Sequence, residues 1–147
     1  MIVYRIAKDN CTTDLSGQGA RLAGGRWNYP GNAVIYTASS PSLCLLELMI
    51  HLPSGQLPPH FSLVTLDIPD LIIRQIPLEQ LPAGWNSYPV KNITMQKGDA
   101  IFLENLAPVL SVPSAIVPEE RNYILFPHHP DFKDVRIVAV TPLSTDN

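Results

Sequence analysis

The chain has 147 residues, of which 46% are apolar and 16% are charged, and this charged share lies below the typical quarter or so. The composition favours one domain over residues 1–147 with a well-buried core, and it argues against a disordered chain. The net charge is −3 and no two basic residues are adjacent, so direct nucleic-acid binding through a basic patch is not expected.

The N-terminal part of the chain predicts short strands and turns. Its first residues lack the pattern of a signal peptide, and no apolar stretch has the length of a membrane span, so we expect a cytoplasmic protein without membrane contact. Ile2 to Ala7 alternate as a strand does. Residues 8–25 are predicted as a glycine-rich loop. The Pro30–Gly31 turn separates residues 26–28 from a strand over residues 33–37, which predicts a hairpin or a strand pair.

A helix is predicted after Ser39. A serine N-cap followed by proline at the first helical position is a typical helix start, and the apolar pattern continues to about His51 or Leu52. Leu43, Glu47 and Ile50 share one face of this helix at spacings of four and three.

The remaining elements complete a mixed, strand-rich α+β fold. The 15 prolines, roughly twice the average share, make long helices unexpected. We predict strands over Phe61–Ile68, Leu71–Ile76, Val109–Val112 and Arg136–Thr141, an irregular segment over Pro77–Pro89, and a helix over Thr94–Leu103.

Glu47 is the first candidate for a functional residue. It is the only Asp, Glu, Lys or Arg between Trp27 and Leu66, and it lies within an apolar run. Burying a bare carboxylate is costly, so it must be solvated through a cleft, paired or held protonated. A functional carboxylate and a core carboxylate that accepts a backbone amide both fit this pattern. The nearest upstream charge, Arg26, suggests an anion-binding group in the same pocket.

The sequence matches none of the known phosphate-binding or metal-binding motifs that we compared with it. Gly17-x-Gly19 has Leu22 where a third glycine would fall, and no P-loop lysine is present. A loop flanked by Arg21 and Arg26 could still bind phosphates. The four histidines lack metal-ligand spacing, so no metal site is expected. Cys11 and Cys44 show no paired spacing, and no structural disulfide is expected.

Three further polar residues have two interpretations each. Ser114 lacks a nucleophile-elbow sequence and fits a hydrogen-bond donor in a pocket. Asn122 fits the same role, or a loop amide that bonds its own backbone. Tyr36 ends the predicted strand, where it is either a core residue or part of the site.

Several segments together carry a family resemblance. They are Gly17–Asn28 (GQGARLAGGRWN), Val34–Ser39, Leu45–Glu47, His51–Leu52, Val112–Pro118 and Asn122–Phe132. In order and spacing they resemble the RES-domain family over nearly the whole chain. This resemblance implies a fold similar to that of ADP-ribosyltransferases. It also implies the toxin of a bacterial toxin–antitoxin pair, with NAD as the substrate.

The resemblance assigns roles to individual residues. It implies that Arg26, Tyr36, Glu47 and Ser114 form the site, with Arg21 and Asn122 as secondary candidates. We expect Glu47 to stabilise an oxocarbenium-like transition state and hold a ribose hydroxyl. Arg26 would bind the pyrophosphate, Tyr36 would pack against nicotinamide and Ser114 would bond the ribose.

The reaction and the assembly stay open on sequence alone. Cleavage of the nicotinamide–ribose bond of NAD can deliver ADP-ribose to water, to a protein or to phosphate, and these three outcomes share every earlier step. A binding module without catalysis is a fourth reading. The resemblance implies an Xre-type antitoxin that covers the active site, in a hetero-oligomer, and a homodimer is the other assembly considered.

Overall fold

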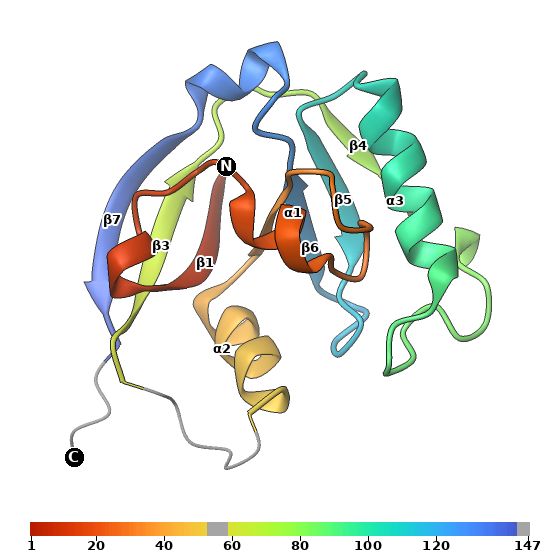
Figure 1. Cartoon of the computed structure of the whole chain (residues 1–147), viewed down its shortest axis with the longest axis horizontal. Helices are drawn as coiled ribbons and strands as arrows, with labels where there is room; N and C mark the ends of the chain where they lie inside the picture. The colour runs from red at the N-terminus through yellow and green to blue at the C-terminus, as the bar shows by residue number, and fades with distance from the viewer. Residues whose placement is uncertain (53–58, 144–147) are drawn as a thin grey trace.

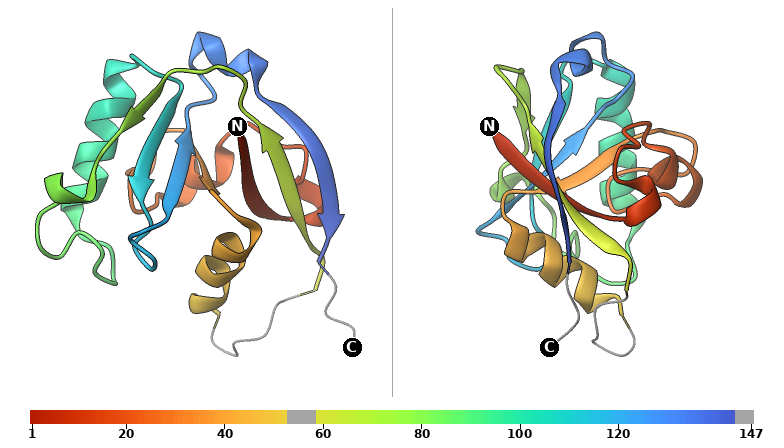
Figure 2. Two further views of the ribbon diagram at one scale, coloured as in Figure 1. Left: turned by 180° about the vertical axis from the view of Figure 1, so that it is seen from behind. Right: turned by 90° about the vertical axis from the view of Figure 1, so that its left-hand side faces the viewer.

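One seven-stranded sheet organises the computed structural model, which describes residues 1–52 and 59–143 (Figure 1). The strands are β1 (Ile2–Lys8), β2 (Ile35–Ala38), β3 (Phe61–Asp67), β4 (Ile73–Gln75), β5 (Val109–Pro113), β6 (Arg121–Leu125) and β7 (Arg136–Pro142). Their spatial order is β4-β5-β6-β2-β1-β3-β7. Only the β4–β5 pair among them is parallel. The sheet is strongly twisted, so its two halves cross in the side view of Figure 2.

Three helices accompany the sheet in the described residues. They are α1 (Gln18–Ala23), α2 (Pro41–Ile50) and α3 (Asn92–Glu104), with short 3-10 turns at Asp9–Cys11, Leu78–Gln80 and Pro130–Asp134. α3 runs beside β4 and β5, whereas α2 lies below the middle of the sheet (Figure 1). None of the described helices is long and apolar enough to cross a membrane. The α+β fold class expected from the sequence is confirmed.

Helix α2 forms as its sequence predicts. The Ser40 hydroxyl accepts a hydrogen bond from the Leu43 amide at 3.1 Å, and Pro41 occupies the first turn. This cap satisfies one of the amides that a helix start leaves without a partner. Leu43 and Cys44 pack on Ala38 of β2 and on partly buried residues of β1. The residues of the predicted shared face become more exposed toward the end of the helix: Leu43 is buried, Glu47 is half-buried and Ile50 is 55% exposed.

The predicted hairpin of residues 26–28 with residues 33–37 is wrong. β2 instead pairs with β1 and β6, and the segment before it makes one isolated bridge between Gly25 and Asn28. A side chain supplies hydrogen bonds that a neighbouring strand would otherwise make: the buried Asn28 amide donates to the carbonyls of Ala20, Tyr29 and Asn32. Such bonding satisfies backbone groups without a second strand.

The glycine-rich segment and the second half of the chain hold further differences. Residues 18–23, predicted as loop, form α1, which follows Gly17 at φ 75. β6 was not predicted, and the predicted strand over Leu71–Ile76 shortens to β4. α3 extends the predicted helix at both ends. Gly98 in α3 lies so close to Trp27 that an added Cβ would be 1.7 Å from the Trp27 carbonyl oxygen.

Candidate active site

A cavity of about 450 Å³ opens beside α2. Its walls come from one face of α2, from the Gly24–Trp27 segment, from β1, β2 and β6, and from the loop after Trp85. Its lining includes Arg5, Arg26, Tyr36, Thr37, Cys44, Glu47, Leu48, Ile50, His51, Asn86, Tyr88 and Asn122. A volume of this size falls within the range of small-molecule sites.

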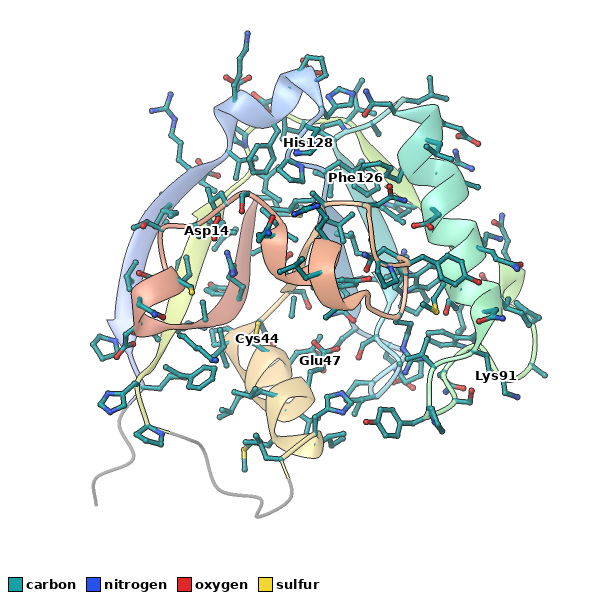
Figure 3. All side chains as sticks on the ribbon, in the orientation of Figure 1. Asp14, Cys44, Glu47, Lys91, Phe126 and His128 are labelled. Carbon is teal, nitrogen blue, oxygen red and sulfur yellow. The ribbon has the colours of Figure 1, made fainter. Side chains whose placement is uncertain are left out.

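Glu47 is fixed on the wall of this cavity by two donors. Its Oε2 accepts a hydrogen bond from the Ser114 hydroxyl at 3.0 Å, and its Oε1 accepts one from the Asn122 side-chain amide at 2.9 Å. Figure 3 shows Cys44 and Glu47 on the side of α2 that faces the sheet. The structure therefore brings together three residues that the sequence named as candidates.

The other hydrogen bonds of Ser114 and Asn122 fix both groups as donors to Glu47. The Ser114 oxygen already accepts from the amides of Ile116 and Val117, both at 3.2 Å, so its proton is directed at Glu47. The Asn122 amide nitrogen also donates to the Thr37 carbonyl at 3.1 Å. Both partners therefore present hydrogens to Glu47, and a carboxylate, which only accepts, is the group that fits them.

Opposing effects act on the protonation of Glu47. Burial raises the pKa of Glu47 above its ordinary value, while the hydrogen bonds from Asn122 and Ser114 and the charge of His51 lower it. Burial disfavours the charged form, whereas donors stabilise that form. The carboxylate is thus poorly hydrated but supported by fixed dipoles, which are the conditions of a functional carboxylate.

Ser114 lies behind Glu47 rather than on the cavity wall. It is completely buried, and its hydroxyl is committed to Glu47 and to two backbone amides. It is absent from the cavity lining. In this structure the Ser114 hydroxyl thus contacts Glu47 and backbone amides rather than the cavity, and its expected contact with ribose stays a prediction.

Arg26 reaches the cavity but is partly engaged. One of its terminal nitrogens donates to the carbonyls of Trp85 and Ser87, at 2.9 and 3.1 Å. These bonds fasten the loop that forms one wall of the cavity. Burial lowers the pKa of Arg26, and the proximity of Tyr36 and Glu47 opposes that effect. The guanidinium stays charged and close to Glu47, with its other nitrogens available for an anion.

Tyr36 lines the cavity, and its hydroxyl is hydrogen-bonded to Trp27 and Asn28. The hydroxyl accepts from the Trp27 amide at 2.9 Å and donates to the Asn28 side-chain oxygen at 2.7 Å. Burial raises the pKa of Tyr36 well above its ordinary value. The neutral phenol therefore holds the segment that carries Arg26, and only its ring face remains for packing against a ligand. An added Cβ on Gly25 would lie 2.6 Å from this hydroxyl.

Arg5 is a cavity residue that the sequence analysis missed. It lies on β1 between Val3 and Ala7, both buried, and lines the main cavity as well as a second one of about 210 Å³ beside the glycine-rich segment. Its guanidinium donates to the Asp14 carbonyl at 2.8 Å. The signal was present in the sequence, because an arginine alternating with two apolar residues lies on the core face of a strand.

Arg21 is not brought to the cavity. Its side chain is exposed and bonds Gln18 within α1 at 3.0 Å, and it lines neither cavity described above. Both cysteines are free thiols. Within residues 1–52 and 59–143, no three His, Cys, Asp or Glu side chains are grouped closely enough to hold a metal ion.

Comparison with known proteins identifies the family. The model of the RES domain family matches residues 2–146. The chain belongs to the RES domain family. The relative named Prs ADP-ribosylating toxin, from Sphingobium sp. (strain YBL2), is 40% identical over 139 residues, which covers 90% of this chain and 86% of the relative. Toxin Res of Yersinia enterocolitica is 36% identical and covers 98% of this chain and 95% of the relative.

The fold of this RES domain also has a solved counterpart. A chain of the crystal structure of the M. tuberculosis MbcT–MbcA toxin–antitoxin complex aligns with a TM-score of 0.84. The alignment covers 97% of this chain and 84% of that chain, at 22% sequence identity. At that identity the likeness concerns the fold, and it agrees with the family assignment of this RES domain.

Proposed function

We propose that this RES domain is the toxin of a toxin–antitoxin pair and that it cleaves the nicotinamide–ribose bond of NAD. The observation that carries the proposal is Glu47, a carboxylate on the wall of a cavity, held by two side chains that donate hydrogen bonds to it. The relatives support the toxin role, since they are named Toxin Res and Prs ADP-ribosylating toxin.

One carboxylate suffices for this cleavage. Nicotinamide leaves as a neutral pyridine, so its departure needs no general acid, unlike ordinary glycoside hydrolysis. As the bond breaks, positive charge develops on the ribose. Glu47 would stabilise that charge and hold a ribose hydroxyl. Because Ser114 and Asn122 fix the carboxylate beforehand, little reorganisation is needed during the reaction.

Two arginines supply charge for the diphosphate of NAD. Arg5 and Arg26 both line the cavity, and a guanidinium matches phosphate oxygens in geometry and charge. The ring of Tyr36 lies between the two cavities, because it lines both of them. In this proposal it packs against the nicotinamide.

Transfer of ADP-ribose to a protein is the second candidate reaction. It is favoured by the relative named Prs ADP-ribosylating toxin, which is 40% identical. The acceptor would then be a side chain of a target protein rather than water, and phosphate is a third acceptor. The cleavage step by Glu47 is the same in all three reactions.

An antitoxin is the proposed protein partner. The structural counterpart comes from a toxin–antitoxin complex, and we propose an Xre-type antitoxin that covers the cavity beside α2. The proposal predicts that a co-purified antitoxin suppresses NAD consumption by the wild-type chain, which a spectrophotometric NAD assay measures directly.

The decisive experiment follows NAD over time with the chain made by cell-free synthesis, which avoids toxicity to a host. Wild type, Glu47→Ala, Glu47→Gln and the control Glu104→Gln are compared, with and without phosphate. Glu104 is an exposed residue of α3 paired with Arg74, outside the cavity lining. We expect NAD loss with wild type and Glu104→Gln only.

Labelled NAD separates the acceptors in the same experiment. Label retained on a protein band indicates transfer, and a dependence on added phosphate indicates phosphorolysis. Persistent NAD in the wild-type sample, with and without cell extract as a source of acceptors, would contradict the proposed chemistry and favour a non-catalytic binding module.

A further inference from the structure

His51 lies on the same face of α2 as Glu47, one turn closer to the helix C-terminus. Both residues line the main cavity. Glu47 is half-buried, whereas His51 is exposed, so the imidazole lies on the solvent side of the carboxylate. An acceptor that binds in this cavity together with NAD would share it with both His51 and Glu47.

The imidazole ring of His51 contacts the ring of Tyr88, which also lines the cavity. The rings of His51 and Tyr88 have centroids 5.1 Å apart and planes tilted by 39°. Tyr88 belongs to the loop that Arg26 fastens, and it is 74% exposed. A neighbouring aromatic ring at this distance limits the orientations that the imidazole can take.

His51 ends α2, four residues after Glu47. His51 is the C-cap of α2, and its amide bonds the carbonyls of Leu48 and Met49. Cations are stabilised at the negative end of a helix dipole. A positive charge on His51 also interacts with Glu47, since it lowers the pKa of that carboxyl. The charge that His51 gains when it takes a proton would therefore form beside a carboxylate and at a helix C-terminus, both of which attract positive charge.

We propose that His51 is the general base that takes the proton from the acceptor, with Tyr88 as the residue that positions its ring. The proposal rests on the proposed cleavage of NAD, and it applies to acceptors that carry a proton, which are water and protein hydroxyl groups. Neither residue belongs to the set that the sequence assigned to the chemistry.

The atoms and charges balance in this step. The bond from ribose C1′ to the pyridinium nitrogen breaks, and its electron pair neutralises the nicotinamide ring. The acceptor oxygen forms a new bond to C1′ and gives its proton to an imidazole nitrogen of His51. The positive charge that leaves the pyridinium therefore ends on His51, next to Glu47.

The test measures kcat and KM for NAD hydrolysis by wild type, His51→Gly and the control His128→Gly, each with and without added imidazole. Glycine is well tolerated at the end of a helix, so the fold should survive. His128 lies at the far end of the molecule from Glu47 (Figure 3). A positioned base contributes ~10²–10⁴-fold, so we expect kcat to fall by about that factor in His51→Gly with KM for NAD within ~3-fold.

Added imidazole distinguishes a base from a structural residue. We expect millimolar imidazole to restore kcat in His51→Gly and to leave wild type and His128→Gly unchanged. For Tyr88, we expect Tyr88→Ala to lower kcat with little change in KM, and Tyr88→Phe to retain the wild-type value because the ring remains.

Wild-type turnover in His51→Gly, or a loss that imidazole does not restore, would overturn the assignment of His51. Glu47→Ala, assayed beside these variants, separates the two proposals. NAD cleavage that requires Glu47 but not His51 leaves the proposed function intact and rejects the base. No cleavage by the wild type rejects both.

Discussion

Removing the Ser114 hydroxyl tests whether its hydrogen bond keeps Glu47 ionised. In Ser114→Ala the carboxylate loses the donor at 3.0 Å, while its protonated form loses much less. A hydrogen bond to a charged group contributes ~1.5–3 kcal/mol. Since each 1.4 kcal/mol or so is a factor of ten in an equilibrium constant, the protonation equilibrium of Glu47 should shift about 10- to 150-fold toward the acid.

The sign of the effect follows from the form that the donor stabilises. The Ser114 bond lowers the pKa of Glu47, so its loss raises that pKa. A reaction that needs ionised Glu47 is lost as the pH falls through this pKa. The acid limb of the kcat/KM profile for NAD should therefore move to higher pH in the variant. A ¹³C NMR titration of the Glu47 carboxyl gives the same information without any assumption about activity.

Ser62→Ala is a matched control. Ser62 is also a buried serine that donates to a carboxylate, with 2.6 Å between its hydroxyl and Asp9, but it does not line the main cavity. Its removal should leave the titration of Glu47 unchanged. If Ser114→Ala folds and Glu47 titrates as in the wild type, the view that fixed donors maintain the carboxylate is refuted.

Three further predictions concern the frame of the site. Gly98→Ala should lower the melting temperature strongly and abolish activity, because the new Cβ would meet the Trp27 carbonyl at 1.7 Å; a thermal melt that matches wild type would show that α3 can move away. Tyr36→Phe leaves the Trp27 amide without its acceptor and should cost ~1–3 kcal/mol, measured by urea unfolding. Burial raises the pKa of the Cys44 thiol to about 12, so at pH 8 it stays protonated and iodoacetamide should modify Cys11 first, as peptide mass spectrometry would show.

Helix α2 and its carboxylate were predictable because their signals are local. The serine cap and the proline after it define a helix start within three residues. The 3.6-residue period then places Glu47 with apolar neighbours, and its isolation from other charges marks it for attention. These features predicted a carboxylate among apolar neighbours, but they fitted a core carboxylate as well as a functional one, and only the fold places Glu47 on a cavity wall.

The missed elements depend on contacts between distant segments. β6 begins with Arg121 and Asn122, whose polarity suggests a loop. In the structure Arg121 donates to Ser111 and to the Ile76 carbonyl, and Asn122 donates to Glu47. Polar residues are thus tolerated in this strand because their hydrogen-bond partners come from elsewhere in the fold. The local sequence pattern does not reveal those partners.

The predicted hairpin failed for a related reason. Pro30–Gly31 is a turn signal, but a turn does not specify which strands pair. Asn28 and Tyr36 bond the backbone of the segment directly, so it needs no strand partner. Alternation places Arg5 on the buried face of β1, but the segments that complete the cavity around it come from distant parts of the chain.

The electrostatics of Glu47 finally depend on the register of a hairpin. α2 supplies the acid, whereas β5 and β6 supply the donors: Asn122 pairs with Val112, and the Ser114 amide bonds the Glu120 carbonyl at 2.9 Å just beyond the strands. A slip of one residue in this pairing would turn Asn122 to the other face of the sheet. Glu47 would then keep its burial but lose a donor, and burial alone favours the protonated acid. The β5–β6 register is therefore as much a determinant of an ionised Glu47 as the helix that carries it.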